Sequence, residues 1–371
     1  MRSSGAHALL ESPAARAAVA AVLAFIGAAG VAIGGPLSEP GYRVERFAHP
    51  AGGPVAVHVA LSEPALVTVT AHDANHVPVA TVAAGELRPA GDVTVSWNGQ
   101  TDTGEAAPRG AYYFVVEASG ESGWERHDPA LDTGGEPLVF GPGEQLHDRK
   151  RGEIVFTLRR PAWVVARAGV RDGPQLAAPI DWQPFDAGQH RVAWNGKDDS
   201  GLLELAALPR QALLVEAFAL PRGSIALDGP APSKRPAPAG KAAIRRAQIA
   251  KAAAARGADP RWMEPQHHRT SPGFTISVRP PEAAKSASGA VALALEVSAD
   301  EATRTRLLEQ RFEIVTFVDY RRVAEEEQGY LPYSLELPKQ ILPPGAHTVS
   351  VSIVTFSGQG ATRSVKLGGS P

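Results

Sequence analysis

The sequence of 371 residues contains no cysteine. This absence excludes disulfides, thiolate zinc sites, iron–sulfur clusters, covalently attached c-type haem, cysteine nucleophiles and a lipid-modified N-terminal cysteine. The sequence also lacks a strong net charge, because 37 Lys and Arg residues are balanced by 39 Asp and Glu residues. This balance excludes a uniformly basic nucleic-acid-binding protein and a uniformly acidic, chaperone-like chain.

Signatures of catalysis are missing as well. The sequence has no HExxH, GxSxG or GxxxxGK[ST] motif. His267 and His268 are its only adjacent histidines, and neighbouring side chains on an extended chain point apart and rarely share a metal. Asp102, Asp198 and Asp199 lack the alternating oxygen ligands of a calcium loop and are interpreted as turn formers. We therefore expect a protein that is not an enzyme and has no cofactor or metal.

A long uncharged run occupies the N-terminus. Residues 17–35 form 19 consecutive uncharged positions, long enough to cross a bilayer as a helix. Gly30 and Gly34 form a GxxxG pair that permits close packing of membrane helices. We expect a retained anchor in the inner membrane over residues 17–36, with residues 1–16 in the cytoplasm and the rest on the periplasmic face. The alternative is a secretory signal cleaved near residue 36.

An internal repeat follows, with an offset of 97 residues. Leu61–Ala71 reads LSEPALVTVTA, and Leu158–Ala168 reads LRRPAWVVARA. The same offset relates a set of turn residues, which are Trp97 and Trp194, Asn98 and Asn195, Gly99 and Gly196, Asp102 and Asp199, and Gly104 and Gly201. These coincidences, without a gap, indicate two copies of one structural unit.

Each unit has the pattern of a β-sandwich. Apolar residues alternate with polar ones over Val55–Leu61, Leu66–Thr70 and Val93–Trp97, and Tyr112–Val116 closes the first unit. Asn, Asp and Gly follow the tryptophan, where a turn needs positive φ and side-chain-to-backbone hydrogen bonds. We expect the tryptophan before this turn to fill the end of the sandwich.

Residues 57–118 resemble the Ig-like domain of the flagellar hook-capping protein, a module that recurs in bacterial secreted and surface proteins. The resemblance rests on a pattern made of Gly91, Val95, Trp97, Asn98, Gly99, Asp102, Gly104, Pro108, Gly110 and Tyr112. The second copy keeps Gly188 and the turn but reads Leu208-Pro209-Arg210-Gln211-Ala212 where the family has Gly-x-Tyr, so we expect a remodelled last strand there. The resemblance implies the module and not a flagellar role.

These observations predict an all-β chain of three tandem Ig-like or fibronectin-like sandwiches. The expected Ig-like domains are residues 44–125, 150–222 and 273–369, separated by linkers at 126–149 and 223–272. The third domain is predicted from the strand patterns of Val291–Leu295, Phe312–Val318 and Thr348–Ile353, and resembles a generic bacterial Ig-like domain.

The second linker is strongly basic. Residues 229–272 carry nine basic residues against two acidic ones. The Ala-rich stretch 241–256 predicts a helix that stops at Gly257 and whose only large apolar residues, Ile244 and Ile249, leave it in need of a partner surface. The candidate partner-binding residues are Lys234, Arg235, Lys241, Arg245, Arg246, Lys251 and Arg256. An acidic protein surface is the preferred partner; the alternatives are anionic lipid, nucleic acid, which is the least favoured, and a solvated spacer.

The predicted function is a non-catalytic scaffold or accessory subunit that docks on the outer face of a membrane protein complex. One conceivable host is an electron-transfer or photosynthetic complex with a periplasmic cytochrome. The second hypothesis is a cell-surface or appendage protein, hook-cap-like or adhesive. The third is a glycan-binding module, in which Tyr112 or Tyr113 could stack on sugar rings. We expect neither a small-molecule substrate nor a nucleic acid as partner.

Overall fold

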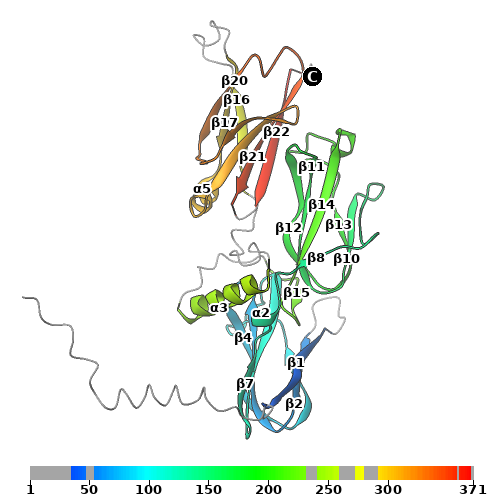
Figure 1. The fold of residues 1–371 in the computed structure, drawn as a ribbon, viewed down its shortest axis with the longest axis vertical. Helices are drawn as coiled ribbons and strands as arrows, with labels where there is room; N and C mark the ends of the chain where they lie inside the picture. The colour runs from blue at the N-terminus through cyan, green and yellow to red at the C-terminus, as the bar shows by residue number, and fades with distance from the viewer. Residues whose placement is uncertain are drawn as a thin grey trace, which may run out of the picture.

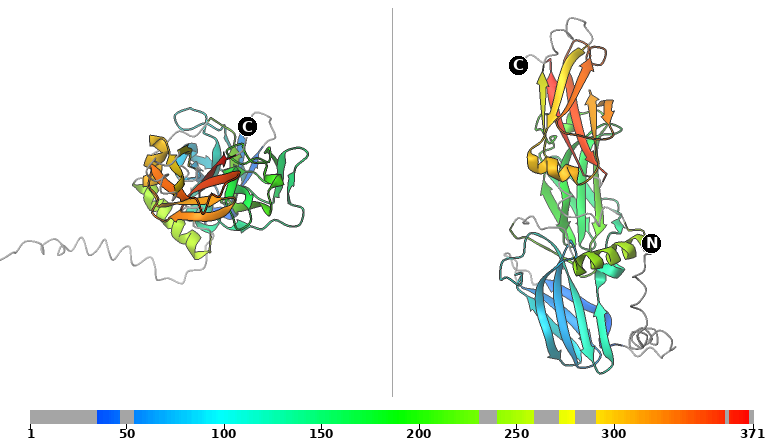
Figure 2. Two further views of the ribbon diagram at one scale, coloured as in Figure 1. Left: turned by 90° about the horizontal axis from the view of Figure 1, so that it is seen from above. Right: turned by 90° about the vertical axis from the view of Figure 1, so that its left-hand side faces the viewer.

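A computed structural model describes residues 35–46, 54–230, 240–258, 272–279, 291–356 and 359–368 of the chain. The strands of these residues form six sheets. The sheets pair face to face as three β-sandwiches along an elongated molecule, with domain 1 at one end (Figures 1 and 2). The predicted all-β fold is confirmed for these residues, and their sheets are consistent with tandem Ig-like or fibronectin-like sandwiches.

Domain 1 combines a three-stranded sheet of order β1-β2-β5 with a second sheet of order β15-β6-β3-β4, in which β7 also pairs with β6. Its strands are β1 (Leu37–Arg46), β2 (Val55–Leu61), β3 (Ala65–Asp73), β4 (Pro78–Arg88), β5 (Gly91–Trp97), β6 (Gly110–Gly120), β7 (Gly123–His127) and β15 (Ile225–Leu227). The alternating valines of β2 and β3 face inward, and Val57, Val59, Val67 and Val69 are fully buried. Trp97 lies in the same core, as expected of a residue that fills the sandwich end.

Domain 2 repeats this arrangement. Its sheets have the orders β13-β10-β9 and β12-β11-β14-β8. Its elements are β8 (Pro137–Leu138), β9 (Gln145–Asp148), β10 (Glu153–Leu158), β11 (Ala162–Val170), β12 (Gln175–Phe185), β13 (Gly188–Ala193), the 3-10 helix η1 (Leu205–Ala207) and β14 (Gln211–Ala219). A short helix, α2 (Pro129–Asp132), precedes it. In domain 1, β2 pairs with β5 in one sheet, and β3, β4 and β6 lie in the other. In domain 2, β10 pairs with β13 in one sheet, and β11, β12 and β14 lie in the other, which is the arrangement expected of a repeated unit.

The repeat extends to single hydrogen bonds. The indole N–H of Trp97 donates to the carbonyl of Gln100 at 2.7 Å, and that of Trp194 to the carbonyl of Lys197 at 3.1 Å. In both turns the asparagine side chain accepts a backbone N–H two residues on, at 3.0 Å. Gly99 and Gly196 have φ values of 76° and 77°, which a residue with a side chain rarely adopts.

The turn aspartates are also equivalent. Asp102 accepts the backbone N–H of Thr81 at 2.7 Å, and Asp199 accepts that of Ala178 at 3.2 Å. The units differ where the second copy lacks Gly-x-Tyr. There the chain forms η1, Arg210 adopts a φ of 58°, and β14 starts only at Gln211.

The segments between the domains are built into the sheets. Within the predicted linker 126–149, β8 pairs with β14 and β9 pairs with β10. After domain 2 the chain returns to domain 1, where β15 pairs with the start of β6. The predicted linker from residue 223 therefore begins too early, because Ile225 and Leu227 are buried in the core of domain 1.

Domain 3 pairs a sheet of order β16-β17-β20 with a sheet of order β19-β18-β21-β22. Its elements are β16 (Thr275–Arg279), β17 (Val291–Ser298), α5 (Glu301–Leu308), β18 (Phe312–Val318), β19 (Arg321–Glu326), β20 (Tyr333–Pro338), β21 (His347–Thr355) and β22 (Gly360–Leu367). Strand β22 lies beside β12 of domain 2, as Figure 1 shows. The backbone N–H of Ser364 donates to the hydroxyl of Ser200 at 2.8 Å across this contact, and Tyr320 packs against the core of domain 2.

Domain 1 also starts earlier than predicted, at Leu37 and not at residue 44. Pro36 accepts the backbone N–H of Ser62 at 3.0 Å, and the N–H of Leu37 donates to Glu125 at 3.0 Å. Residues 35 and 36, placed in the membrane segment by the sequence, thus belong to the folded domain. The rest of that segment, with Gly30 and Gly34, lies outside the described residues. Within the described residues, no helix is long and apolar enough to span a membrane.

Candidate functional site

The junction between domains 1 and 2 has an apolar core of its own. It gathers buried residues of domain 1, domain 2 and the linker helix α3 (Lys241–Ala255). These residues are Ala111, Tyr113, Val115, Ala130, Trp163, Val165, Trp182, Phe218, Leu220, Ile249 and Ala253. Two domains and a distant helix therefore share one desolvated interior, which we call the junction core.

The strands at the junction are buried on both faces. On β6, Tyr112, Phe114 and Val116 point into the sandwich of domain 1, while Tyr113 and Val115 point into the junction core. Strand β11 does the same in domain 2 with Trp163 and Val165. A continuous apolar run, as opposed to an alternating one, is typical of a strand that is covered on both sides. The segments Tyr112–Val116 and Ala162–Ala166 carry this signal.

Helix α3 closes the junction from outside, lying across the end of domain 1 where domain 2 begins (Figure 2). Ile249 and Ala253, one helical turn apart, are 0% and 2% exposed, whereas Ile244 is 63% exposed. The partner surface that this alanine-rich helix was predicted to need is thus supplied by its own chain.

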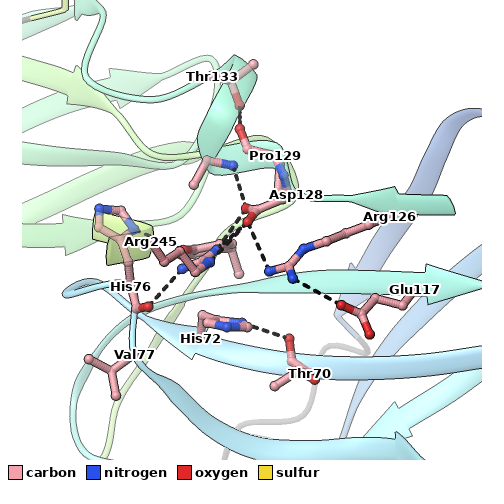
Figure 3. A network of polar contacts seen from close by, with 12 residues as sticks. Thr70, His72, His76, Val77, Glu117, Arg126, Asp128, Pro129, Thr133 and Arg245 are labelled. Atoms are coloured by element: carbon pink, nitrogen blue, oxygen red, sulfur yellow. Dashed lines mark hydrogen bonds and ion pairs between the residues drawn. The ribbon is translucent and has the colours of Figure 1, made fainter. Parts of the chain in front are cut away.

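An ion pair fastens the helix to domain 1. The guanidinium of Arg245 contacts both carboxylate oxygens of Asp128, with Nη2 at 2.8 and 2.7 Å and Nε at 3.1 Å (Figure 3). Its Nη1 donates to the backbone carbonyl of His76 at 2.8 Å, and the guanidinium carbon lies 5.6 Å from the ring centre of Tyr113. Side-chain exposure is 12% for Arg245 and 2% for Asp128. A forked, desolvated pair of this kind fixes the orientation of the helix as well as its position.

Local chemistry places the Asp128 carboxylate. Asp128 is the N-cap of α2, whose first helical residue is Pro129, and its side chain accepts the backbone N–H of Ala130 at 3.3 Å. Arg126 of β7 lies 3.5 Å from the same carboxylate and 3.1 Å from Glu117 (Figure 3). The Asp-Pro pair inside the predicted linker is the sequence signal for this position, and Asp128 is not among the residues predicted to form a site.

Two histidines and a tyrosine complete the buried polar network. Nδ1 of His72 lies 3.2 Å from the carbonyl oxygen of Thr70, and Nδ1 of His76 lies 2.9 Å from the Tyr113 hydroxyl. Burial, and after it the positive charge of Arg245, lowers the pKa of His72 to about 3. Burial raises the pKa of Tyr113 above its usual range. Both groups are therefore neutral near pH 7 and are enclosed, an arrangement suited to holding the junction together.

A second arginine secures the other end of α3. Nη2 of Arg256 donates to the carbonyl of Gly134 at 3.3 Å, Nη1 donates to the carbonyl of Leu131, and Nε lies 3.7 Å from Glu136. These partners lie between domains 1 and 2, so both ends of α3 contact the segment that links the two sandwiches.

The candidate partner-binding residues of the basic linker fall into three groups. Arg245 and Arg256 contact this chain, so their assignment to an external acidic partner is corrected: the carboxylate bound by Arg245 is Asp128 of the same chain. Lys241 and Lys251 are exposed on α3, and Arg246 is half-buried. Lys234 and Arg235, like the pair His267 and His268, lie outside the described residues.

The repeated turn residues are structural in both copies, as their hydrogen bonds show. Asp199 also contacts domain 3, because Arg363 lies 3.9 Å from its carboxylate. Among the described residues, no group of three or more His, Asp or Glu side chains is arranged to hold a metal ion.

Comparison of this chain with known proteins gives matches among solved structures but not among curated proteins. The solved structures similar to it include fibronectin(III)-like modules of Clostridium thermocellum CbhA, with 10% identity over 89% of this chain and 90% of that one and a TM-score of 0.17. Another is a structure described as giving insight into host cell surface retention of a 1.5-MDa bacterial ice-binding adhesin. It has 10% identity over 85% of this chain and 89% of that one, with a TM-score of 0.19.

One part of the chain matches a family directly. Residues 46–122 match the model of the FlgD Ig-like domain. This segment runs from the end of β1 to the turn before β7 and includes the Trp97 turn and Tyr112. Domain 1 is therefore an Ig-like domain of the FlgD type, which confirms the resemblance read from its sequence.

Proposed function

We propose that this protein is a non-catalytic, extracytoplasmic scaffold, an accessory subunit that docks on the outer face of a membrane protein complex. The observation that supports this proposal is the junction core, which joins domain 1, domain 2 and α3 into one body. Tandem domains move relative to each other unless their interface is large and apolar. Here the interface is apolar, carries a buried ion pair and is crossed by β15.

A rigid body suits a subunit that must hold a partner in one orientation. Association has a free-energy cost for ordering flexible parts, and a preorganised surface lowers that cost. The closure of the junction therefore favours a role in binding and spacing over one in which the domains clamp a ligand between them.

Within the described part of the basic linker, the exposed face of α3 is open to a partner. Lys241 and Lys251 are exposed there, with the exposed Ile244 between them in the chain. An acidic surface of a neighbouring subunit would complement these lysines. A periplasmic cytochrome of an electron-transfer or photosynthetic complex is one host with such a surface.

The glycan-binding alternative loses the residues on which it rested. Tyr112 and Tyr113 are 3% and 2% exposed, and each packs in an apolar core. Neither ring is available to stack on a sugar.

Extraction of native membranes in mild detergent, followed by size separation and mass spectrometry, tests the proposal. We expect the chain to travel in fixed ratio with a membrane complex and to retain its N-terminus. Replacing Lys241 and Lys251 by glutamate should release it from that complex, whereas Lys339→Glu, at an exposed lysine of domain 3, should not. A chain that starts near residue 36 and runs alone would overturn the proposal.

The second candidate is a cell-surface or appendage protein, and the match of domain 1 to the FlgD Ig-like domain favours it. Release of the chain into the medium, or its presence on isolated filaments, would support this alternative over the accessory subunit.

A further inference from the structure

Three large apolar side chains lie exposed in one row across the outer face of domain 1. Leu66 of β3 is paired with Leu87 of β4 on one side and with Ser119 of β6 on the other, and Ser119 is paired with Trp124 of β7. Leu66 is 49%, Leu87 73% and Trp124 63% exposed. Since residues directly opposite on neighbouring strands share a face, Leu66, Leu87 and Trp124 form one strip, which we call the apolar row.

The apolar row is the open end of the sheet face that is covered at the junction. Alternate residues of β6 face outward, in the order Tyr113, Val115, Glu117 and Ser119. Tyr113 and Val115 lie in the junction core, Glu117 is half-buried, and Ser119 is exposed. The cover provided by domain 2 and α3 therefore ends before the apolar row is reached.

The chain enters domain 1 beside this row. Leu37 is held to β7 by the hydrogen bond from its N–H to Glu125, the neighbour of Trp124 in sequence. Gly35, two residues before Leu37, lies at the end of residues 17–35, the uncharged stretch that is expected to span the membrane. A membrane span formed by that run would bring this end of domain 1 against the bilayer surface.

The charges around the apolar row determine which surface suits it. Acidic residues predominate: Glu63 accepts a hydrogen bond from Ser122 at 2.9 Å, Glu121 is exposed, and Glu86 is already paired with Arg88. Anionic headgroups would be repelled by such a rim, whereas zwitterionic headgroups would not. Tryptophan with leucine is the composition that settles at the boundary between headgroups and acyl chains.

We propose that the apolar row lies in the interfacial layer of the bilayer that holds the N-terminal segment, so that domain 1 rests on the membrane and domain 3 is held away from it. This inference rests on the membrane anchor of the proposed function. Three side chains bind a bilayer weakly by themselves, but a tether supplies a high effective concentration. The contact would set the angle between the long axis of the molecule and the membrane.

The absence of cysteine allows a direct test. In the full chain, reconstituted in phosphatidylcholine liposomes, a spin label at Ser119→Cys would report on the apolar row. The matched control is Ser96→Cys, exposed on the opposite sheet of the same domain. We expect the label at position 119 to be several-fold more accessible to oxygen, relative to a water-soluble nickel chelate, than the label at position 96.

A variant distinguishes insertion of the apolar row from mere closeness of the label to the membrane. Leu66→Ser, Leu87→Ser and Trp124→Ser together should return the label at position 119 to water, while Val139→Ser, at an exposed valine elsewhere, should not. Thermal unfolding checks that both variants are folded.

The outcomes distinguish this inference from the proposed function. A chain that floats with the liposomes but keeps both labels in water would overturn the inference and leave the anchor intact. A full chain that does not float would overturn the anchor, and the inference with it. A label at position 119 that is protected only in native membranes would assign the apolar row to a protein partner and also overturn the lipid contact.

Discussion

At the scale of the residue, Asp128 links several parts of the junction. It caps α2 and pairs with Arg245 and Arg126 while its side chain is only 2% exposed. Such a group is costly to remove, because its partner is then left charged and unpaired away from water.

Replacing this carboxylate should destabilise the protein strongly. We expect Asp128→Asn to lower the free energy of unfolding by about 3–5 kcal/mol, the usual effect of breaking a buried ion pair. The matched control is Asp172→Asn, which breaks an exposed pair with Arg210 and should cost less than about 1 kcal/mol. Urea unfolding of both variants measures the difference, and equal losses would contradict the role assigned to Asp128.

His72 makes the junction sensitive to acid. Its pKa is about 3 in the folded protein, below the ordinary value of 6.5 that applies to the unfolded chain. The unfolded state therefore binds the proton first as pH falls, and stability that is fully present above pH 6.5 is lost on the way toward pH 3.

Between about pH 7 and about pH 5, this residue should account for a loss of about 2 kcal/mol. His72→Gln removes the titrating group, so the pH dependence of its unfolding free energy should be flatter by that amount. Denaturant unfolding at the two pH values tests this. A variant with the same pH dependence as the native chain would show that another group causes the loss.

At the scale of the element, α3 shows how far a helix can be read from its sequence. Alanine content and the stop at Gly257 predicted its limits, and the helix runs from Lys241 to Ala255. Its partner surface was not predictable, because Asp128 lies 117 residues before Arg245 in the chain. Helical propensity acts within a few residues, whereas docking depends on where the sheets place Tyr113 and Trp163.

Two isoleucines of α3 provide a matched pair of substitutions. Both gain the same helical propensity on replacement by alanine, but Ile249 is fully buried and Ile244 is exposed. Ile249→Ala should destabilise the docked helix by about 2–5 kcal/mol, and Ile244→Ala should leave it within about 0.5 kcal/mol.

The rate of trypsin cleavage measures this difference in helix docking, because Arg245, Arg246 and Lys251 lie within the helix. Cleavage inside α3 should accelerate in Ile249→Ala only. If both variants were cleaved at the same rate, the helix would not be held by the junction core.

At the scale of the whole molecule, domains 1 and 2 should behave as one body. Spin labels at Ser96→Cys and Ala193→Cys, exposed positions related by the repeat, should give a single narrow distance distribution. Adding Ile249→Ala should broaden it, because the closing helix then leaves more often. A broad distribution in the otherwise unaltered chain would contradict the rigid junction on which the proposed function rests.

The sequence by itself determined the parts of this protein that depend on local chemistry. Period-2 alternation, the Trp-Asn-Gly turns and the offset of 97 residues predicted two related sandwiches, and alanine content predicted the helix between domains 2 and 3. Each signal is contained in a short stretch of chain, where backbone geometry and hydrogen bonds to near neighbours decide the outcome.

The tertiary structure alone decided what holds these parts together. The pairing of β15 with β6, the burial of Ile249 and the ion pair of Arg245 with Asp128 join residues far apart in the chain. A charged residue in a basic segment looks the same in sequence whether it faces solvent or a buried carboxylate. Only the packing of two sheets and a helix removes the water between them, and that desolvation turns a basic linker into part of the protein's interior.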